Sequence, residues 1–172
     1  MASNITTSQT VGPFPHEAWA WAVSASAILH TTAPTITISG VLRDGDGASI
    51  NDGWIEAWMP DAAAAETAQP IPGFRRIASD DDGAFRIEVS LPGPARAGKP
   101  VLFATVFARG LVKHQFSAVF LEDDSGLAQS EILGQVPADR RPTLIARKLG
   151  DARYHWDIWM QGDKETVFFD YV

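Results

Sequence analysis

The sequence contains no cysteine, few histidines and no long hydrophobic run. Without cysteine there is no disulfide framework, no zinc–thiolate site and no thiol nucleophile. Because no apolar run approaches membrane-spanning length, we expect no membrane association. The first residues also lack the basic and apolar regions of a signal peptide. These absences predict a cytoplasmic protein.

Basic residues are too few and too dispersed for a nucleic-acid interface. Fourteen Lys and Arg face 21 Asp and Glu, giving a net charge of −7, whereas phosphate binding draws on clustered positive charge. Hydrophobic residues make up 45% of the chain and charged residues 20%, which is the balance of a globular protein. We therefore expect one domain over residues 1–172 that does not bind nucleic acid.

Alternating apolar side chains separated by turns predict an all-β fold. Residues 35–40, 84–89 and 115–120 alternate as strands with one buried face do. Residues 44–47 and 80–83 are turns rich in Asp and Gly, and the first lacks the spacing and distal glutamate of a calcium loop. About seven such strands with little helix indicate a β-sandwich of mostly antiparallel strands with short helices.

One strand is expected in the middle of this sandwich. Between Val101 and Phe107 the only polar side chain is Thr105, and a strand that is apolar on both faces is covered on both sides. It ends in a turn at Arg109, which can present a positive charge at the rim of the sheet. An arginine beside a turn is more often simply solvated, and both interpretations stay open at this point.

The two ends of the chain carry further signals. Residues 154–160 place large side chains on one face, and a turn at 161–164 with a return at 166–169 predicts a C-terminal hairpin. Tyr154 is expected in the core with its hydroxyl satisfied. At the other end, Val11 and Phe14 favour an arm that docks against a neighbour.

No arrangement of residues in the sequence indicates catalysis. No two histidines are spaced i,i+2 or i,i+4, so neither a strand nor a helix presents a ligand pair. We expect His114, between Lys113 and Gln115, to face solvent. A serine nucleophile elbow and a glycine-rich phosphate loop are also missing. The residues alone describe a β-sandwich without visible catalytic groups.

The order of several motifs resembles a known family. They are TSQTVGPF at 7–14, GWIEAW at 53–58, DDGAF at 81–85, LPGP at 91–94, VFARG at 106–110, VPADRRPTLIA at 136–146 and GDKETVFFD at 162–170. Together they resemble the intradiol ring-cleaving dioxygenases over nearly the whole chain. The FARG and ETVFFD elements are specifically similar to the alpha subunits of heteromeric members that cleave protocatechuate.

The resemblance also shows where this chain departs from the family. Catalytic members hold ferric iron with two tyrosines and two histidines. One tyrosine position is Ala95 here, and the other falls in the alanine-rich residues 60–69. The histidines belong to a Pro-x-His-x-His pattern, which here places Leu102 and Ala104 in their positions. Hydrocarbon side chains cannot bind Fe(III), so we expect this region to be packed with apolar groups.

The resemblance therefore implies an alpha subunit with no catalytic residue and no metal of its own. A homologous beta subunit would hold Fe(III), in a higher (αβ)n oligomer that cleaves protocatechuate with O2 to 3-carboxy-cis,cis-muconate. Residues 1–34 would form an N-terminal arm and partner-docking segment. Family residues that line the partner's pocket carry over to Gly12, Pro13 and Arg109 as substrate-binding residues.

These three residues suit that role physically. Gly12 allows close backbone approach to a flat ring, and Pro13 offers a rigid apolar wall. Arg109 keeps its positive charge and suits a substrate bearing a carboxylate.

Two other functions stay open from the sequence. A stand-alone β-sandwich that binds a small ligand or a carbohydrate could use Trp19 and Trp21 as a platform, in a segment that is irregular or a short helix. An independently active dioxygenase would need iron ligands that are missing where they are expected.

Overall fold

The computed structural model describes residues 9–10, 12, 20–27, 29–91 and 96–170, and strands predominate in this part of the chain. The strands are β1 (Thr35–Arg43), β2 (Trp54–Trp58), β3 (Phe74–Ala78), β4 (Ala84–Ser90), β5 (Leu102–Phe107), β6 (Gln115–Leu121), β7 (Ile145–Gly150), β8 (Arg153–His155) and β9 (Ile158–Trp159). The helices are α2 (Ala20–Ala27) and α3 (Glu131–Gly134), with 3₁₀ turns η1 (Pro60–Ala65), η2 (Leu127–Gln129) and η3 (Arg141–Leu144). None of the helices described is long and apolar enough to cross a bilayer.

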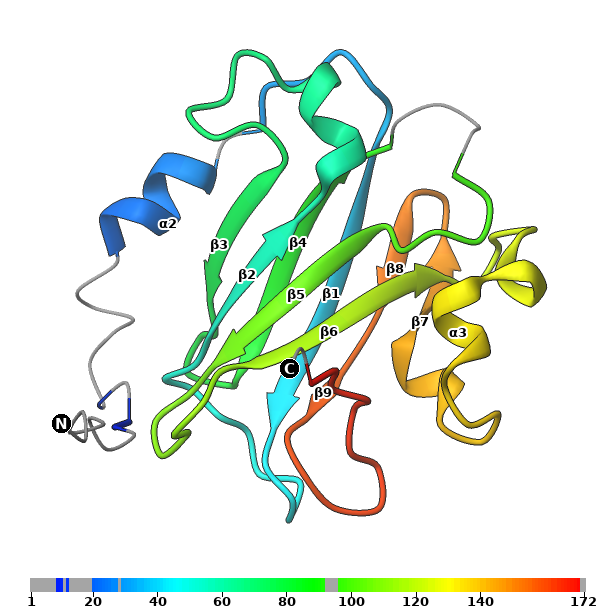
Figure 1. The fold of residues 1–172 in the computed structure, drawn as a ribbon. Coiled ribbons are helices and arrows are strands. Elements are labelled where there is room, and N and C mark those ends of the chain that lie inside the picture. Colours follow the sequence, from blue (N-terminus) through cyan, green and yellow to red (C-terminus); the bar gives the residue numbers. More distant parts are fainter. Residues whose placement is uncertain (1–8, 11, 13–19, 28, 92–95, 171–172) are drawn as a thin grey trace, which may run out of the picture.

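The strands follow the order β3-β2-β5-β6-β7-β8-β1-β4, and β9 pairs with β1. Figure 1 shows β2, β5 and β6 passing in front of β4, β1 and β8, so that the path folds into two layers. The β1–β4, β2–β3, β2–β5, β5–β6 and β7–β8 pairs are antiparallel, whereas β1–β8, β1–β9 and β6–β7 are parallel. The predicted β-sandwich of mostly antiparallel strands with short helices is confirmed.

The predicted central strand is β5, which lies between β2 and β6 in its sheet. Leu102, Ala104 and Val106 belong to the larger hydrophobic cluster. On the opposite face, Phe103 packs against a smaller cluster built around Phe120. Because each face of β5 meets a hydrophobic cluster, both of its faces are apolar, and even Thr105 is buried.

Both predicted aspartate-rich turns form. The Asp44 carboxylate accepts hydrogen bonds from the backbone N–H groups of Asp46 and Ala48, and Asp80 does the same for Asp82 and Ala84. These contacts close the tight turns before β2 and β4, and each aspartate is explained by its local backbone partners.

The predicted C-terminal hairpin is wrong. Tyr154, Trp156, Ile158 and Met160 do share the core face, and the chain does turn at Gly162. After Thr166, however, the returning segment leaves this path, and Phe169 forms an isolated bridge with Phe116 of β6. Val167 and Phe169 thereby pack against the smaller core cluster. A two-stranded ribbon alone would bury less apolar surface.

Candidate functional site

Arg109 lies just beyond the end of β5, at the rim of the sheet, as the sequence predicts. In the antiparallel β2–β5 pair, Trp54 lies opposite Phe107. Continuing this register beyond both strands brings Asp52 opposite Arg109. The two side chains form an ion pair, with Arg109 Nε 3.0 Å from Asp52 Oδ2.

The two members of this pair differ sharply in exposure. The Arg109 side chain is 68% exposed, whereas that of Asp52 is only 8% exposed. The other carboxylate oxygen, Asp52 Oδ1, is buried without a hydrogen-bond partner. In the part of the chain that the structure describes, the closest contact of the Arg109 guanidinium with Asp52 is made by Nε, and no hydrogen bond involves its terminal nitrogens. A buried anion thus contacts an arginine whose side chain is mostly exposed to solvent.

The backbone beside Asp52 is closely packed. A Cβ on Gly53 would lie 2.4 Å from Leu42 Cδ2 and 3.1 Å from the Phe107 carbonyl oxygen, so any larger residue here would displace the Leu42 side chain. The Ser79 hydroxyl accepts a hydrogen bond from the Gly53 N–H and donates one to the Gly53 carbonyl. This packing ties the residue after Asp52 to the end of β5 and to the loop that follows β3.

A group of aromatic rings packs on the strands that lead to Asp52 and Arg109. Trp54 and Phe107 stack with centroids 4.4 Å apart and planes within 6°. His114 lies 5.3 Å from the Phe107 ring and contacts Phe116 edge-on at 4.6 Å. The expectation that His114 faces solvent is therefore wrong: it is half-buried between two rings. The polar neighbours Lys113 and Gln115 suggested solvent exposure, but the two ring partners come from β5 and β6 and are not evident from the adjacent sequence.

Two of the three predicted site residues, Gly12 and Arg109, are among the described residues. Gly12 has φ +81°, a conformation that suits glycine, and no atom lies within 4 Å of where a Cβ would stand. Among the described residues no hydrogen bond or ion pair links Gly12 to Arg109. Pro13, like Val11, Phe14, Trp19 and Ala95, lies outside the described residues. The roles of Gly12, Pro13 and Arg109 stay predictions.

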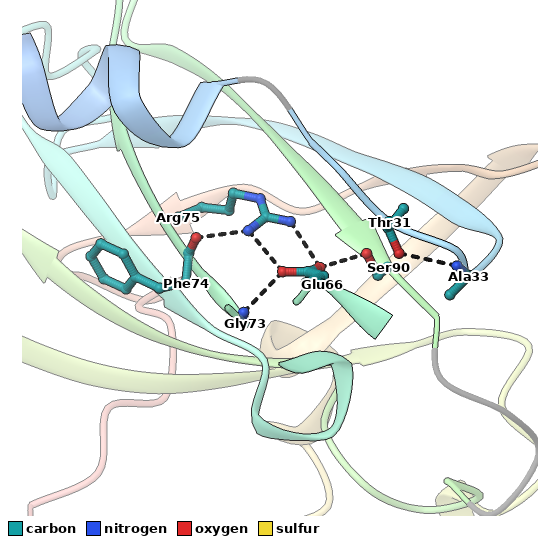
Figure 2. A network of polar contacts seen from close by, with 7 residues as sticks. All are labelled: Thr31, Ala33, Glu66, Gly73, Phe74, Arg75 and Ser90. Carbon is teal, nitrogen blue, oxygen red and sulfur yellow. Dashed lines mark hydrogen bonds and ion pairs between the residues drawn. The ribbon is translucent and has the colours of Figure 1, made fainter. Parts of the chain in front are cut away.

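A second arginine–carboxylate pair lies inside the sandwich (Figure 2). Glu66, just after η1, accepts hydrogen bonds from both terminal nitrogens of Arg75 on β3, from the Gly73 N–H and from the Ser90 hydroxyl at the end of β4. Both charged side chains are buried, at 0% and 4% exposed. Burial alone raises the pKa of Glu66, but the hydrogen bonds from Arg75, Ser90 and Gly73 outweigh it and lower that pKa. This pair fastens the alanine-rich segment to β3 and β4.

Tyr154 confirms its sequence prediction. Its ring is buried in the larger core cluster, and its hydroxyl donates a hydrogen bond of 2.9 Å to Asp123 Oδ1. Burial, together with the adjacent carboxylate, raises the pKa of Tyr154 to about 12. The hydroxyl thus stays protonated at neutral pH and serves as a donor within the fold.

A groove of about 390 Å³ lies under α2. Trp21 from α2, Trp58 from β2 and Phe74 from β3 line it, and the Arg76–Glu56 ion pair lies among the lining residues. Trp21 and Trp58 are both exposed. The structure thus places one of the two tryptophans of the predicted ligand platform at a hollow, apolar surface.

Known proteins resemble the chain over almost its whole length. It is 31% identical to the protocatechuate 3,4-dioxygenase alpha chain of Burkholderia cepacia and 30% identical to that of Pseudomonas putida. Each alignment covers 96% of this chain and 96% of the relative. The chain belongs to the protocatechuate 3,4-dioxygenase alpha chain family. No protein-family model matches it.

Solved structures resemble the fold of this alpha-chain family member. The dioxygenase domain of a dioxygenase–carbohydrate-binding fusion from Streptomyces sp. SirexAA-E superposes with a TM-score of 0.60 at 14% identity, covering 77% of this chain and 82% of that one. Hydroxyquinol 1,2-dioxygenase from Pseudomonas putida DLL-E4 superposes with a TM-score of 0.57 at 17% identity, covering 76% and 57%. At such low identity these matches bear on the fold alone, and they agree with the predicted intradiol-dioxygenase sandwich.

The positions where the resemblance expects histidine ligands do not fit iron in this alpha-chain family member. Leu102 and Ala104 are 0% and 1% exposed and face the larger core cluster. Neither side chain has a lone pair to donate to Fe(III). The expected apolar packing at these two positions is therefore present. Within the described residues, no group of three or more His, Cys, Asp or Glu gathers as a metal site.

Proposed function

We propose that this chain is the alpha subunit of a heteromeric intradiol dioxygenase. It assembles with a homologous beta subunit that holds Fe(III), and the complex cleaves protocatechuate with O2 to 3-carboxy-cis,cis-muconate. The observation that carries this proposal is the buried hydrocarbon of Leu102 and Ala104, in a chain of the alpha-chain family. No step of ring cleavage runs through this chain, and alone it is inactive.

The contribution of this chain is to orient the substrate and exclude water. Protocatechuate carries a carboxylate on the ring, and the exposed terminal nitrogens of Arg109 offer a charged fork that matches it. Gly12 and Pro13, on the arm formed by residues 1–34, close the pocket from the same subunit. The arm docks on the beta subunit, and αβ units associate further into (αβ)n. The cytoplasm is the predicted compartment, which cell fractionation tests.

Co-purification of the complex with metal analysis of each chain tests the assignment of iron. We expect Fe(III) with the beta subunit and a stable complex between the two chains. Stoichiometric Fe(III) with a tyrosinate absorption band in this chain alone would overturn the proposal. So would a stable monomer that does not bind the partner.

Arg109→Ala in the assembled complex tests the substrate contact. We expect kcat/KM for protocatechuate to fall roughly 10- to 150-fold. This corresponds to a loss of about 1.5–3 kcal/mol in transition-state stabilisation, the scale of a hydrogen bond to a charged group. Arg86→Ala is the matched control because that side chain is 66% exposed, on β4. Unchanged kcat/KM with normal assembly would remove Arg109 from the site.

The groove under α2 favours the alternative, a stand-alone module that binds a small ligand or a carbohydrate. Trp21 and Trp58 give it two exposed aromatic faces, on which flat ligands or sugars can stack. Titration of small aromatics and sugars into the full chain, followed by tryptophan fluorescence, tests this function. Saturable binding that Trp58→Ala abolishes would support it, and the main proposal predicts none.

A further inference from the structure

We propose that Asp52 is the positioning residue for Arg109. Its buried carboxylate holds the inner nitrogen of the guanidinium, so that the two outer nitrogens are preset to receive the substrate carboxylate. This inference rests on the proposed function, which makes Arg109 the group that meets the anion. Asp52 itself touches no substrate in this scheme.

The difference in exposure within the pair is the first support. An exposed arginine samples many rotamers, and ordering them on binding costs free energy. Asp52, only 8% exposed, is fixed by the fold and contacts Nε of Arg109 at 3.0 Å. Because Asp52 is already ordered, it reduces the conformational entropy that the Arg109 side chain loses when substrate binds.

The anchor is itself rigid. The next residue, Gly53, is packed so closely against Leu42 and Phe107 that a Cβ there would force the Leu42 side chain to move. The Ser79 hydroxyl holds both the N–H and the carbonyl of Gly53. Since β2 starts at Trp54, whose ring stacks on Phe107, Asp52 is tied to the same strand end that carries Arg109.

The atoms used in the contact matter as well. Asp52 makes its closest contact with Nε, and no hydrogen bond among the described residues uses the terminal nitrogens, which suit a bidentate contact with a carboxylate. The Arg86–Glu88 pair on β4 is different, because a terminal nitrogen of Arg86 contacts Glu88, whose side chain is 43% exposed. That pair has no buried member and uses up part of the fork.

Asp52 also has an effect that opposes substrate binding. The direction of the change in affinity on substitution therefore tests the proposal. Its negative charge partly offsets that of Arg109 and repels an anionic substrate. If charge alone mattered, Asp52→Asn would tighten substrate binding. If positioning matters, Asp52→Asn loosens it, because the amide holds the guanidinium less firmly.

The experiment is a double-mutant cycle in the assembled complex. Asp52→Asn, Arg109→Ala and the double variant are compared by kcat and KM for protocatechuate, and by the inhibition constant of catechol, which lacks the carboxylate. We expect Asp52→Asn to raise KM about 3- to 10-fold, the scale of ordering one flexible side chain. We further expect kcat within about twofold, unchanged catechol binding and no added effect in the Arg109→Ala background. Glu88→Gln is the matched control and leaves KM unchanged.

Each other outcome decides between the two proposals. If Arg109→Ala has no effect, the proposed role of Arg109 fails, and the role of Asp52 with it. If Arg109→Ala weakens binding but Asp52→Asn leaves KM unchanged or lowers it, only the positioning role is overturned. Equal weakening for catechol, or impaired assembly on gel filtration, would make Asp52 merely structural. Asp52→Glu is the second variant: it keeps the charge but shifts the carboxylate, so positioning predicts a raised KM and pure electrostatics predicts none.

Discussion

Two of the arginine–carboxylate pairs in the described part of the chain use the guanidinium nitrogens differently. In the inner pair, Glu66 engages both terminal nitrogens of Arg75, and both side chains are buried. In the rim pair, Asp52 is buried and makes its closest contact with Nε of Arg109, whose side chain is exposed. Both terminal nitrogens of Arg75 thus already bond to the carboxylate, whereas no hydrogen bond among the described residues uses those of Arg109.

The difference separates a contact that stabilises the fold from one that suits binding. A buried pair such as Arg75–Glu66, in which both carboxylate oxygens are hydrogen-bonded, is costly to break, because the remaining charge has no partner. An exposed arginine adds little to stability but can still meet an anion. Substitutions in the inner pair should therefore lower stability, and those at Arg109 should lower substrate affinity.

The largest effect is expected from Glu66→Ala. It leaves the buried Arg75 charge uncompensated, and we expect the free energy of unfolding to fall by about 3–5 kcal/mol. Urea denaturation of the full chain, followed by tryptophan fluorescence, measures this. The double variant Glu66→Leu/Arg75→Met should recover much of the loss, because it removes both charges together. A loss below about 1 kcal/mol for Glu66→Ala would contradict the structural role given to the pair.

Gly53→Ala should give the next largest loss of stability. This residue lies beside the rim pair. The added Cβ would meet Leu42 Cδ2 at 2.4 Å, and relieving such overpacking costs about 1–3 kcal/mol. Because Asp52 is the adjacent residue, we also expect a raised KM for protocatechuate in the complex. Thermal unfolding and steady-state kinetics measure the two effects. Gly134→Ala is the control, since no atom lies within 4 Å of its added Cβ.

Acid should destabilise the fold through the inner pair, but less than the two substitutions above, because protonation of Glu66 leaves both side chains in place. The pKa of Glu66 is lowered in the folded chain from its ordinary value of 4.5. The ionised carboxylate therefore favours the folded state above about pH 4.5, and this contribution is lost as the pH falls through the lower folded-state pKa. Urea midpoints across this range should fall less steeply for the Glu66→Leu/Arg75→Met variant. Parallel curves for the two proteins would contradict the assignment.

The smallest effect is expected at the exposed Arg86–Glu88 pair. Glu88→Gln should change the free energy of unfolding by less than about 1 kcal/mol, because solvent and salt screen such contacts. The same urea titration measures it. A larger change would contradict the view that burial determines how much an ion pair contributes to stability.

The sequence predicted what depends on local pattern. The apolar run around Thr105 indicated a central strand, and the turn after it placed Arg109 at the rim. Asp52 was missed because its contact depends on the register of β2 against β5, which no local pattern reveals. Glu66 was missed because it lies in an alanine-rich segment whose partners come from β3 and β4. The C-terminal hairpin failed because burial across β6 outweighed local pairing.

The bridge between Phe169 and Phe116 has a practical consequence for work on this protein. Together with the Lys113–Asp170 ion pair, it fastens residues 169–170 next to the segment that leads from Arg109 into β6. An affinity tag fused directly after residue 172 would start three positions beyond Asp170, close in sequence to the residues that contact the segment after Arg109. Purification handles should therefore be cleaved before any KM is measured, or carried on the other subunit.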